Sequence, residues 1–368
     1  MNILALGLDR NLANPQSAGA LRQPEYYRGH QAKVYILETG APAQLRIENV
    51  ETIIPGGGNK IVVLLRTLSR LIFSTTKFDL VIAQDVLFIG LLGYVIALRH
   101  GARLVTQVHG DYLDNPRWLN ERKGNYLRNA IGKFVLRRSD GIRCVSKKII
   151  DDLHVRLHVP VEKMLSAPIG TDLSMFSPDG EHADVGGTFV LFVGRLLPEK
   201  SPFLFCDVMI PLLREQADLQ AVFAGDGPLK AELEKRFVDA GFGQRMHFLG
   251  HVGGADLAKY YRAARVMLHT AAWEGWGMPM VEALACGCPV VSTDTGCAGE
   301  AVLHDVNGLV VPIDDVAALS TATERLLSDD ALYERLHTAA PEAAKEWSFE
   351  ALSKKIRNWY ETIGLHKE

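Results

Sequence analysis

Two glutamates, Glu274 and Glu282, are separated by seven residues in a segment whose local pattern suits ligand binding. A strand-like run over 265–270 comes first, then the loop Glu-Gly-Trp-Gly, then a predicted helix that begins at Met278. Pro279 fits the first turn of that helix, where its missing N–H would be unpaired anyway. A strand, a glycine loop and a helix start direct backbone N–H groups at an anion. Because carboxylates bind sugar hydroxyls well, the segment predicts a site for a nucleotide-sugar.

Two cations, Arg195 and Lys200, lie on the loop that follows a strand-like run over 189–193. Arginine offers a bidentate fork and lysine a point charge, so together they can neutralise a diphosphate. Such a clamp stabilises the charge that grows on a leaving nucleoside diphosphate. Solvated loop cations in ordinary ion pairs are the alternative, and the presence of the Glu274 loop in the same half of the chain favours the clamp.

The first half of the chain holds weaker candidates. His109 follows a strand-like run over 103–108 and can, as a neutral imidazole, bond a sugar hydroxyl or assist a proton transfer. A structural histidine at a strand end is the alternative. Gly19 opens the first predicted helix, where its N–H can meet a phosphate. The first strand is not followed by Gly-x-Gly-x-x-Gly, which argues against a standard dinucleotide site.

The composition is that of a soluble globular protein, with 48% hydrophobic and 23% charged residues, and 368 residues predict two domains. Five cysteines without zinc or redox spacing indicate reduced thiols and a cytoplasmic setting. The N-terminal residues suit a first strand better than a signal peptide. Neither Asp-x-Asp nor a metal-ligand cluster occurs, so we expect no metal and no cofactor other than a nucleotide-sugar co-substrate.

Short apolar runs alternate with amphipathic helical patterns, which predicts parallel strands buried on both faces between helices. The expected strands are 3–8, 33–37, 80–84, 103–108 and 141–145, then 189–193, 220–224, 246–249, 266–270, 289–292 and 308–311. Two doubly wound α/β domains follow, one over 1–172 with a C-terminal helix from 347–368, the other over 186–346. Ligands of such sheets bind at the carboxyl ends of the strands, here expected to face a central cleft.

Charge is distributed unevenly: residues 1–168 hold 23 Lys and Arg against 14 Asp and Glu, and residues 169–368 hold 17 against 29. The basic half favours an anionic partner. Segments 60–73 and 117–138 interleave Lys and Arg with apolar residues at helical spacing. Basic amphipathic helices of this kind can lie on an anionic membrane, and solvated helices packed on a sheet are the alternative. No aromatic stacking platform is present, so we expect no nucleic acid.

Five segments together resemble one known family. They are Phe-Val-Gly-Arg-Leu-Leu-Pro-Glu-Lys, Ala-Gly-Asp-Gly-Pro-Leu, His-Phe-Leu-Gly-His-Val, Glu-Gly-Trp-Gly-Met-Pro-Met-Val-Glu-Ala and Pro-Ile-Gly-Thr-Asp-Leu-Ser-Met-Phe. In these segments the chain resembles the family 4 retaining glycosyltransferases, which are related to glycogen and sucrose synthases. The resemblance implies the GT-B fold, with two Rossmann-like domains, and an enzyme that needs no metal.

The resemblance also implies a role for each matching residue. Glu274 would hold the donor sugar, Glu282 the ribose, and Arg195 with Lys200 the diphosphate. The remaining expected contacts are His109 at the donor sugar, Val252 near the base, and the amides of Gly277, Met278 and the neighbours of Pro279, which has no N–H of its own. The chain departs from the family where Ala18 precedes Gly19, where Ser201 follows Lys200 and where Ile169 precedes Gly170.

The candidate residues, together with what the resemblance implies, predict a retaining, metal-independent glycosyltransferase that moves a hexosyl unit from a UDP- or GDP-sugar. The expected acceptor is a glycan or a polyprenyl-diphosphate-linked saccharide in cell-surface polysaccharide or glycoconjugate assembly. The enzyme would be cytoplasmic or peripheral at the inner face of the cell membrane. A nucleotide-sugar epimerase of the same fold, and a nucleotide-sugar-binding protein without activity, are the alternatives.

Overall fold

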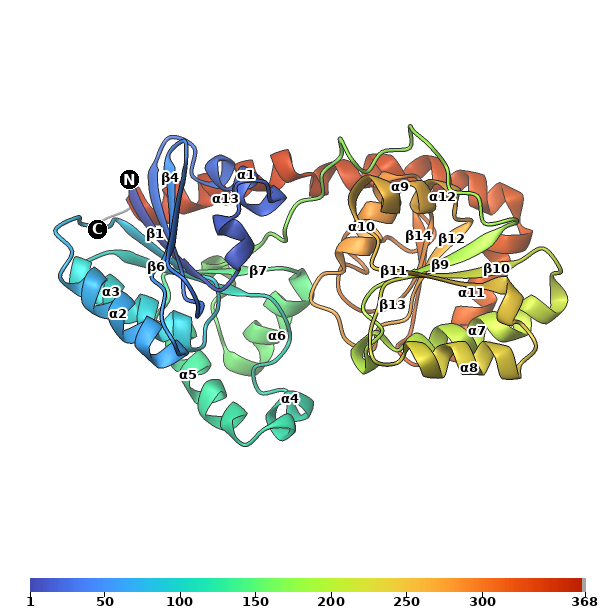
Figure 1. The fold of residues 1–368 in the computed structure, drawn as a ribbon, viewed down its shortest axis with the longest axis horizontal. Helices are drawn as coiled ribbons and strands as arrows, with labels where there is room; N and C mark the ends of the chain where they lie inside the picture. Colours follow the sequence, from blue (N-terminus) through green and yellow to red (C-terminus); the bar gives the residue numbers. More distant parts are fainter. Residues whose placement is uncertain (366–368) are drawn as a thin grey trace. The chain divides into compact units, whose positions relative to one another are not determined.

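The computed structural model describes residues 1–365. In it, the apolar runs of the first half form the parallel strands of an eight-stranded sheet (Figure 1). The strand order is β3-β4-β2-β1-β5-β6-β7-β8, and only β3 runs antiparallel to its neighbour. The strands are β1 (Asn2–Gly7), β2 (Gln31–Ile36), β3 (Ala43–Ile47), β4 (Val50–Ile54), β5 (Leu80–Ala83), β6 (Arg103–Val108), β7 (Gly141–Cys144) and β8 (Met164–Ser166).

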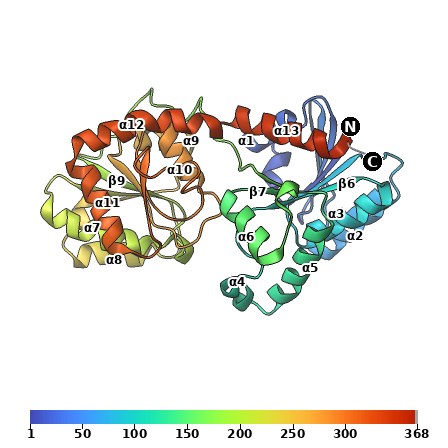
Figure 2. The same ribbon diagram turned by 180° about the vertical axis from the view of Figure 1, so that it is seen from behind.

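Helices cover both faces of this sheet. On one face α2, α3 and α5 pack against one another (Figure 2), and on the other α13 contributes Ile356 and Tyr360 to the core. The helices are α1 (Ala18–Tyr26), α2 (Lys60–Ile72), α3 (Phe88–His100), α4 (Pro116–Glu121), α5 (Gly124–Arg138), α6 (Lys147–Leu157) and α13 (Phe349–Leu365). Met1–Pro168 and the chain from Leu352 onward form this first compact unit, unit 1, and Ile169–Ala351 form unit 2. Residues 366–368 of the predicted C-terminal segment lie outside the described residues.

Unit 2 is built on a six-stranded, fully parallel sheet with the order β11-β10-β9-β12-β13-β14. The strands are β9 (Phe189–Val193), β10 (Gln220–Ala224), β11 (Met246–Gly250), β12 (Val266–His269), β13 (Val290–Thr293) and β14 (Gly308–Val311). The chain runs outward from β9 to β11 and then returns to place β12 on the other side of β9. The carboxyl ends of β9 and β12 therefore flank a topological switch point, where open α/β sheets bind their ligands.

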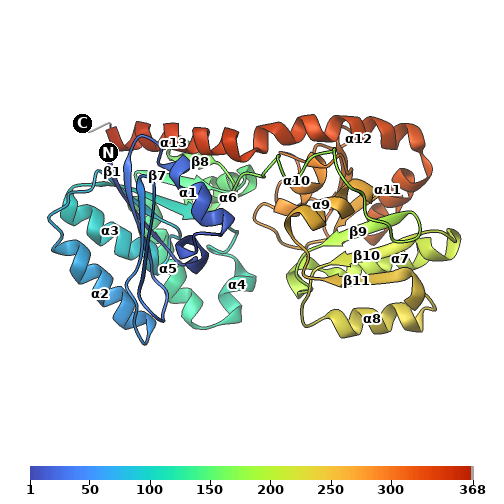
Figure 3. The same ribbon diagram turned by 45° about the horizontal axis from the view of Figure 1, so that its top comes forward.

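Two helical layers enclose the sheet of unit 2, with α7, α8 and α11 on one face and α9 and α10 on the other (Figure 3). The helices are α7 (Pro202–Glu215), α8 (Lys230–Asp239), α9 (Gly254–Ala263), α10 (Met278–Ala285), α11 (Val316–Ser328) and α12 (Asp330–Ala344). Phe192, Phe205 and Phe223 meet in the core of the first face, with ring centroids 4.7–5.7 Å apart. Among the described residues, none of the helices is long and apolar enough to cross a bilayer.

The structure corrects the predicted elements in two places. Strands β3, β4 and β8 were not predicted, because β3 and β4 form a partly exposed edge and β8 has only three residues. The single helix predicted over 117–138 is in fact two, α4 and α5. The chain turns at Arg122 and Lys123, where the Asn125 amide N–H donates to the Arg122 carbonyl and its side chain donates to the Trp118 carbonyl.

The turn after β10 rests directly on the loop after β9, which carries Arg195. Gly194 N–H donates to the Ala224 carbonyl over 3.0 Å, and Leu196 N–H donates to the Asp226 carbonyl over 2.9 Å. A Cβ on Gly227 would lie 2.5 Å from the Leu196 carbonyl oxygen. Glycine is required here because two backbones approach closely, so the Gly-Asp-Gly turn supports the Arg195 loop.

We therefore expect Gly227→Ala to destabilise the protein by about 1–3 kcal/mol, the usual cost of overpacking. Urea unfolding followed by circular dichroism measures the change. Gly58→Ala is the matched control, since a Cβ at Gly58 meets nothing within 4 Å. Equal unfolding midpoints for the two variants would contradict this account of the turn.

Candidate functional site

The strongest candidates meet at the switch point of unit 2. The loop after β9 carries Lys200, and the loop after β12 carries Glu274. The Thr270 hydroxyl lies 3.0 Å from the carbonyl oxygen of Lys200, and the Ala272 N–H donates to the Glu199 carbonyl over 3.2 Å. These bonds join the two loops, so the sheet order and the loop contacts together position the charged side chains.

Lys200 and Glu274 form an ion pair in which the ammonium donates to Oε2 of the carboxylate. The two side chains are only 18% and 15% exposed. Burial by itself raises the pKa of Glu274, but the Lys200 charge and hydrogen bonding outweigh it, and the net pKa is lowered. Gly275 N–H donates to Oε1 of the same carboxylate over 3.1 Å. Glu274 is therefore ionised and held by two donors.

The loop between Glu274 and α10 turns at Gly277, whose φ of +89° lies in the left-handed region that favours glycine. A Cβ at Gly277 would also lie 2.3 Å from Met280 Cε. The helix then begins at Met278 with Pro279 in its first turn, as predicted. The first amides of a helix lack intrahelical acceptors, so the N–H of Met278 is available to an anion at the helix start.

Glu282 lies farther along α10 and accepts a hydrogen bond of 3.0 Å from the Tyr261 hydroxyl of α9. Tyr261 is fully buried, and burial together with the nearby Glu282 charge raises the pKa of its phenol well above the ordinary value. The phenol therefore stays protonated and orients the carboxylate. Tyr261 was not identified from the sequence, where a tyrosine on an amphipathic helix gives no distinctive signal.

Arg195 is not part of the Lys200–Glu274 pair. Its side chain is 74% exposed and lies 3.6 Å from the Glu199 carboxylate. The structure thus brings one of the two predicted diphosphate cations to Glu274 and leaves the other on the solvent side of the same loop.

The candidates of unit 1 lie at strand and helix ends. His109 directly follows β6 and is exposed, and Gly19 is the second residue of α1, whose N-cap Ser17 accepts from Ala20 N–H over 3.1 Å. Protein packed around the ring and the Arg143 charge lower the pKa of His109, while a hydrogen bond to the Gln84 backbone opposes them. Solvent at the exposed ring limits the lowering, and the imidazole is neutral at pH 7.

Two carboxylates near His109 are engaged in ion pairs. Asp111 binds Arg156, and Asp114 binds Lys133 over 2.9 Å. The Lys133 and Asn129 contacts lower the pKa of Asp114 despite its partial burial. These side chains therefore have structural partners, which makes them weak candidates for acid–base chemistry.

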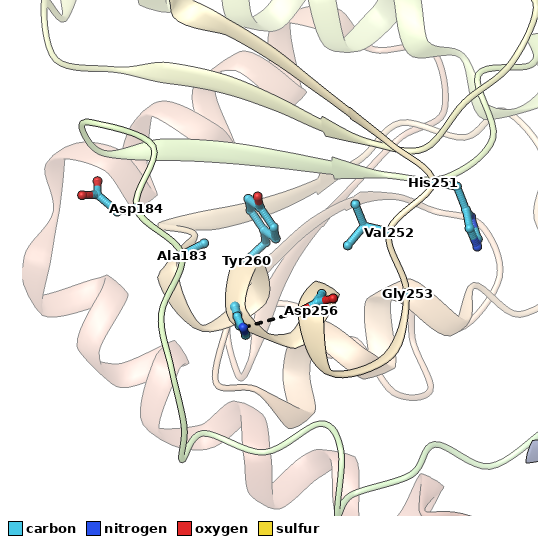
Figure 4. Close-up of a pocket in the computed structure, with 8 residues that line it drawn as sticks. Ala183, Asp184, His251, Val252, Gly253, Asp256 and Tyr260 are labelled. Carbon is cyan, nitrogen blue, oxygen red and sulfur yellow. Dashed lines mark ion pairs between the residues drawn. The ribbon is translucent and has the colours of Figure 1, made fainter.

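Val252 lines an open pocket of about 460 Å³ between the loop after β11, α9 and residues 183–184 (Figure 4). Tyr260 lines the same pocket, and the Asp256–Lys259 ion pair of 3.4 Å borders it. Neither Lys200 nor Glu274 is among its lining residues. The pocket is thus built by unit 2 alone, and the ion pair is not part of its lining.

His269, the last residue of β12, is a further site residue. Its imidazole is buried, and Nε2 lies 3.9 Å from Glu274 Oε2. The sequence predicts only a strand over 266–270. A histidine that ends an apolar run just before a glycine loop is the signal that would have identified it.

Comparison with known families agrees with this geometry. The model described as "Glycosyl transferases group 1" matches residues 177–343, and that described as "Glycosyltransferase Family 4" matches residues 18–175. The chain is 25% identical over 284 residues to alpha-D-kanosaminyltransferase of Streptomyces kanamyceticus, covering 74% of each chain. It is 30% identical over 252 residues to the lipopolysaccharide core biosynthesis mannosyltransferase LpsB of Rhizobium meliloti, covering 63% of this chain and 68% of LpsB.

Solved structures show the same fold. Sucrose-phosphate synthase from Thermosynechococcus elongatus aligns over 100% of both chains with a TM-score of 0.79 and 20% identity. Anabaena HepE, crystallised in complex with UDP, aligns over 98% of this chain and 100% of its own with a TM-score of 0.77 and 18% identity. The chain therefore belongs to the group 1 and family 4 glycosyltransferases and has their GT-B fold of two parallel-sheet α/β domains.

Proposed function

We propose that this glycosyltransferase moves a hexosyl unit from a UDP- or GDP-sugar to a glycan or polyprenyl-diphosphate-linked acceptor, with retention of configuration and without a metal. The observation that carries the proposal is the mostly buried Lys200–Glu274 ion pair at the switch point of unit 2. An anion-binding cation and a hydroxyl-binding carboxylate are what a sugar diphosphate requires at adjacent positions.

The relatives support a nucleotide-sugar donor of this class. LpsB is named a mannosyltransferase, and HepE has been crystallised with UDP-glucose. In this chain we assign the ribose to Glu282, whose carboxylate is oriented by Tyr261. We assign the base to the neighbourhood of Val252, which lines an open pocket on the same unit.

In the proposed reaction, Arg195 and Lys200 bind the diphosphate, assisted by the first amides of α10. The positive charges stabilise the leaving group as the bond between the sugar and the phosphate oxygen breaks. The acceptor oxygen forms the new glycosidic bond on the same face, and its proton passes to that phosphate oxygen. Glu274 holds the sugar hydroxyls.

Epimerisation would need an acid and a base at the sugar ring. Asp111, a carboxylate two residues after His109 in the chain, is paired with Arg156, which favours transfer over epimerisation. Incubating the donor without an acceptor and analysing the sugar by NMR separates the two activities, since only an epimerase converts the donor alone.

Removing either cation should lower turnover. We expect Lys200→Ala and Arg195→Ala each to reduce kcat about 100-fold or more, the usual effect of deleting one group that stabilises developing charge. A melting-shift screen with UDP-, GDP- and ADP-sugars first selects the donor, and transfer is then assayed in EDTA, where activity should persist.

Lys235→Ala is the control for this experiment, because Lys235 is an exposed cation of α8 paired with Asp239. This variant should keep full turnover. Full activity in both Lys200→Ala and Arg195→Ala would show that the diphosphate clamp is wrong.

We further propose that unit 1 binds an anionic membrane surface, which suits a lipid-linked acceptor. The outward side of α2 exposes Ile61 and Leu65, which are 69% and 60% exposed, next to Arg66 and Arg70. Apolar side chains on a solvated helix face are unfavourable in water, whereas insertion among lipid headgroups buries them and pairs the arginines with lipid phosphate.

The neighbouring helices extend this surface. Leu98 of α3 and Tyr126 and Leu127 of α5 are exposed, and the Arg138 guanidinium lies 3.7 Å from the Phe134 ring centroid. Helices α2, α3 and α5 pack side by side, so these residues share one helical layer of unit 1. Arg117 begins the predicted segment 117–138, and its side chain is not among those that the structure describes.

The combined variant Ile61→Ser and Leu65→Ser should weaken binding to vesicles that contain anionic phospholipid by about 100-fold or more, because burying each side chain contributes about 1.5–3 kcal/mol. Flotation at low salt measures the bound fraction. Val155→Ser is the matched control, because Val155 is an exposed apolar residue of α6, a helix of the same unit outside this surface. Wild-type protein that fails to float with these vesicles would overturn the membrane proposal.

A further inference from the structure

One nitrogen of the His269 imidazole, Nε2, is buried and makes no hydrogen bond. This nitrogen has no partner among the described residues, and the side chain is 3% exposed. Buried polar atoms are nearly always paired, because an unpaired one loses its hydration without compensation. An unsatisfied nitrogen at a ligand site therefore needs an explanation.

A possible hydrogen-bond acceptor for this nitrogen is Oε2 of Glu274, which lies 3.9 Å away. That separation is too long for a hydrogen bond. The same oxygen accepts from the Lys200 ammonium. Lys200 thus occupies the acceptor that His269 would otherwise reach.

The two competing donors differ in mobility. His269 is the last residue of the buried strand β12, and its backbone pairs with Ser292 of β13. Its ring therefore has little freedom to move. Lys200 has a long side chain, while its backbone is held by the Thr270 hydroxyl. The ammonium can therefore leave Glu274 for another anion without any movement of the loops, and the imidazole stays beside the carboxylate.

We propose that His269 is a positioning residue that replaces Lys200 as the hydrogen-bond donor to Glu274 when a sugar diphosphate draws the ammonium away. The inference rests on the proposed function, in which Lys200 binds the diphosphate and Glu274 the sugar. A small rotation of the carboxylate closes the gap to Nε2–H. The ring keeps its proton throughout, and Glu274 stays ionised and oriented toward the sugar hydroxyls.

The protonation state of His269 suits this role. Burial first, and then the Lys200 charge, lower its pKa to about 4 against the opposing effect of Glu274. The ring is therefore neutral at pH 7 and can donate from Nε2 without adding a charge to the site. A neutral donor holds the carboxylate while leaving its negative charge available to the sugar hydroxyls.

The first test needs no ligand. In ¹⁵N-histidine NMR spectra, Lys200→Met should shift the His269 Nε2–H resonance to that of a hydrogen-bonded imidazole and slow its solvent exchange relative to wild type. Lys200→Gln provides a second variant, and His269→Gln identifies the signal. An unchanged His269 resonance in both folded Lys200 variants would overturn the proposal whatever the donor is.

The second test measures binding of UDP-glucose and of GDP-mannose by calorimetry. For the nucleotide-sugar that binds the wild-type protein, His269→Leu should lower the affinity by about tenfold. In a Glu274→Ala background the same substitution should lower the affinity much less, because no carboxylate remains to be positioned. His269→Gln, which keeps an N–H donor, should recover part of the loss. Equal losses in both backgrounds would show a purely structural role and overturn the proposal.

The two tests separate the inference from the proposed function. If neither nucleotide-sugar binds wild-type protein, the proposed donor class is wrong, and the ligand-free spectra still decide whether His269 replaces Lys200 at Glu274.

Discussion

The ion pair between Lys200 and Glu274 is the interaction on which the site depends. Strand order places β9 beside β12, and the loops after these strands bring opposite charges together in a mostly buried position. Leaving either charge alone there would be costly, so the pair stabilises both loops in the absence of ligand. In the function that we propose, a diphosphate competes for Lys200, and this competition links donor binding to release of the Glu274 carboxylate for the sugar.

The two units differ in the chemistry that they expose. Unit 2 concentrates the carboxylates, glycine turns and helix start that suit a nucleotide-sugar, and each is supported by a backbone contact or a buried partner such as Tyr261. Unit 1 carries the excess of Lys and Arg, with apolar side chains on the outer faces of α2, α3 and α5. The first pattern suits a small anionic donor, and the second suits a large amphipathic acceptor.

The sequence predicted much of unit 2, because continuous apolar runs such as Phe189–Val193 mark strands buried on both faces. It missed the β3–β4 edge, whose exposed residues break that pattern. At the site, residue types and order indicated Glu274 and Lys200 as ligand contacts but not as partners of each other. It also gave no sign that His269 Nε2 is unpaired, since burial and pairing depend on tertiary packing.

The central claim is that the donor diphosphate takes Lys200 from Glu274. A crystal structure of the complex with the nucleotide-sugar that the melting-shift screen selects tests it most directly. The account predicts the Lys200 ammonium on a phosphate oxygen and the Glu274 carboxylate on a sugar hydroxyl. A bound donor with the Lys200–Glu274 pair still intact would contradict it.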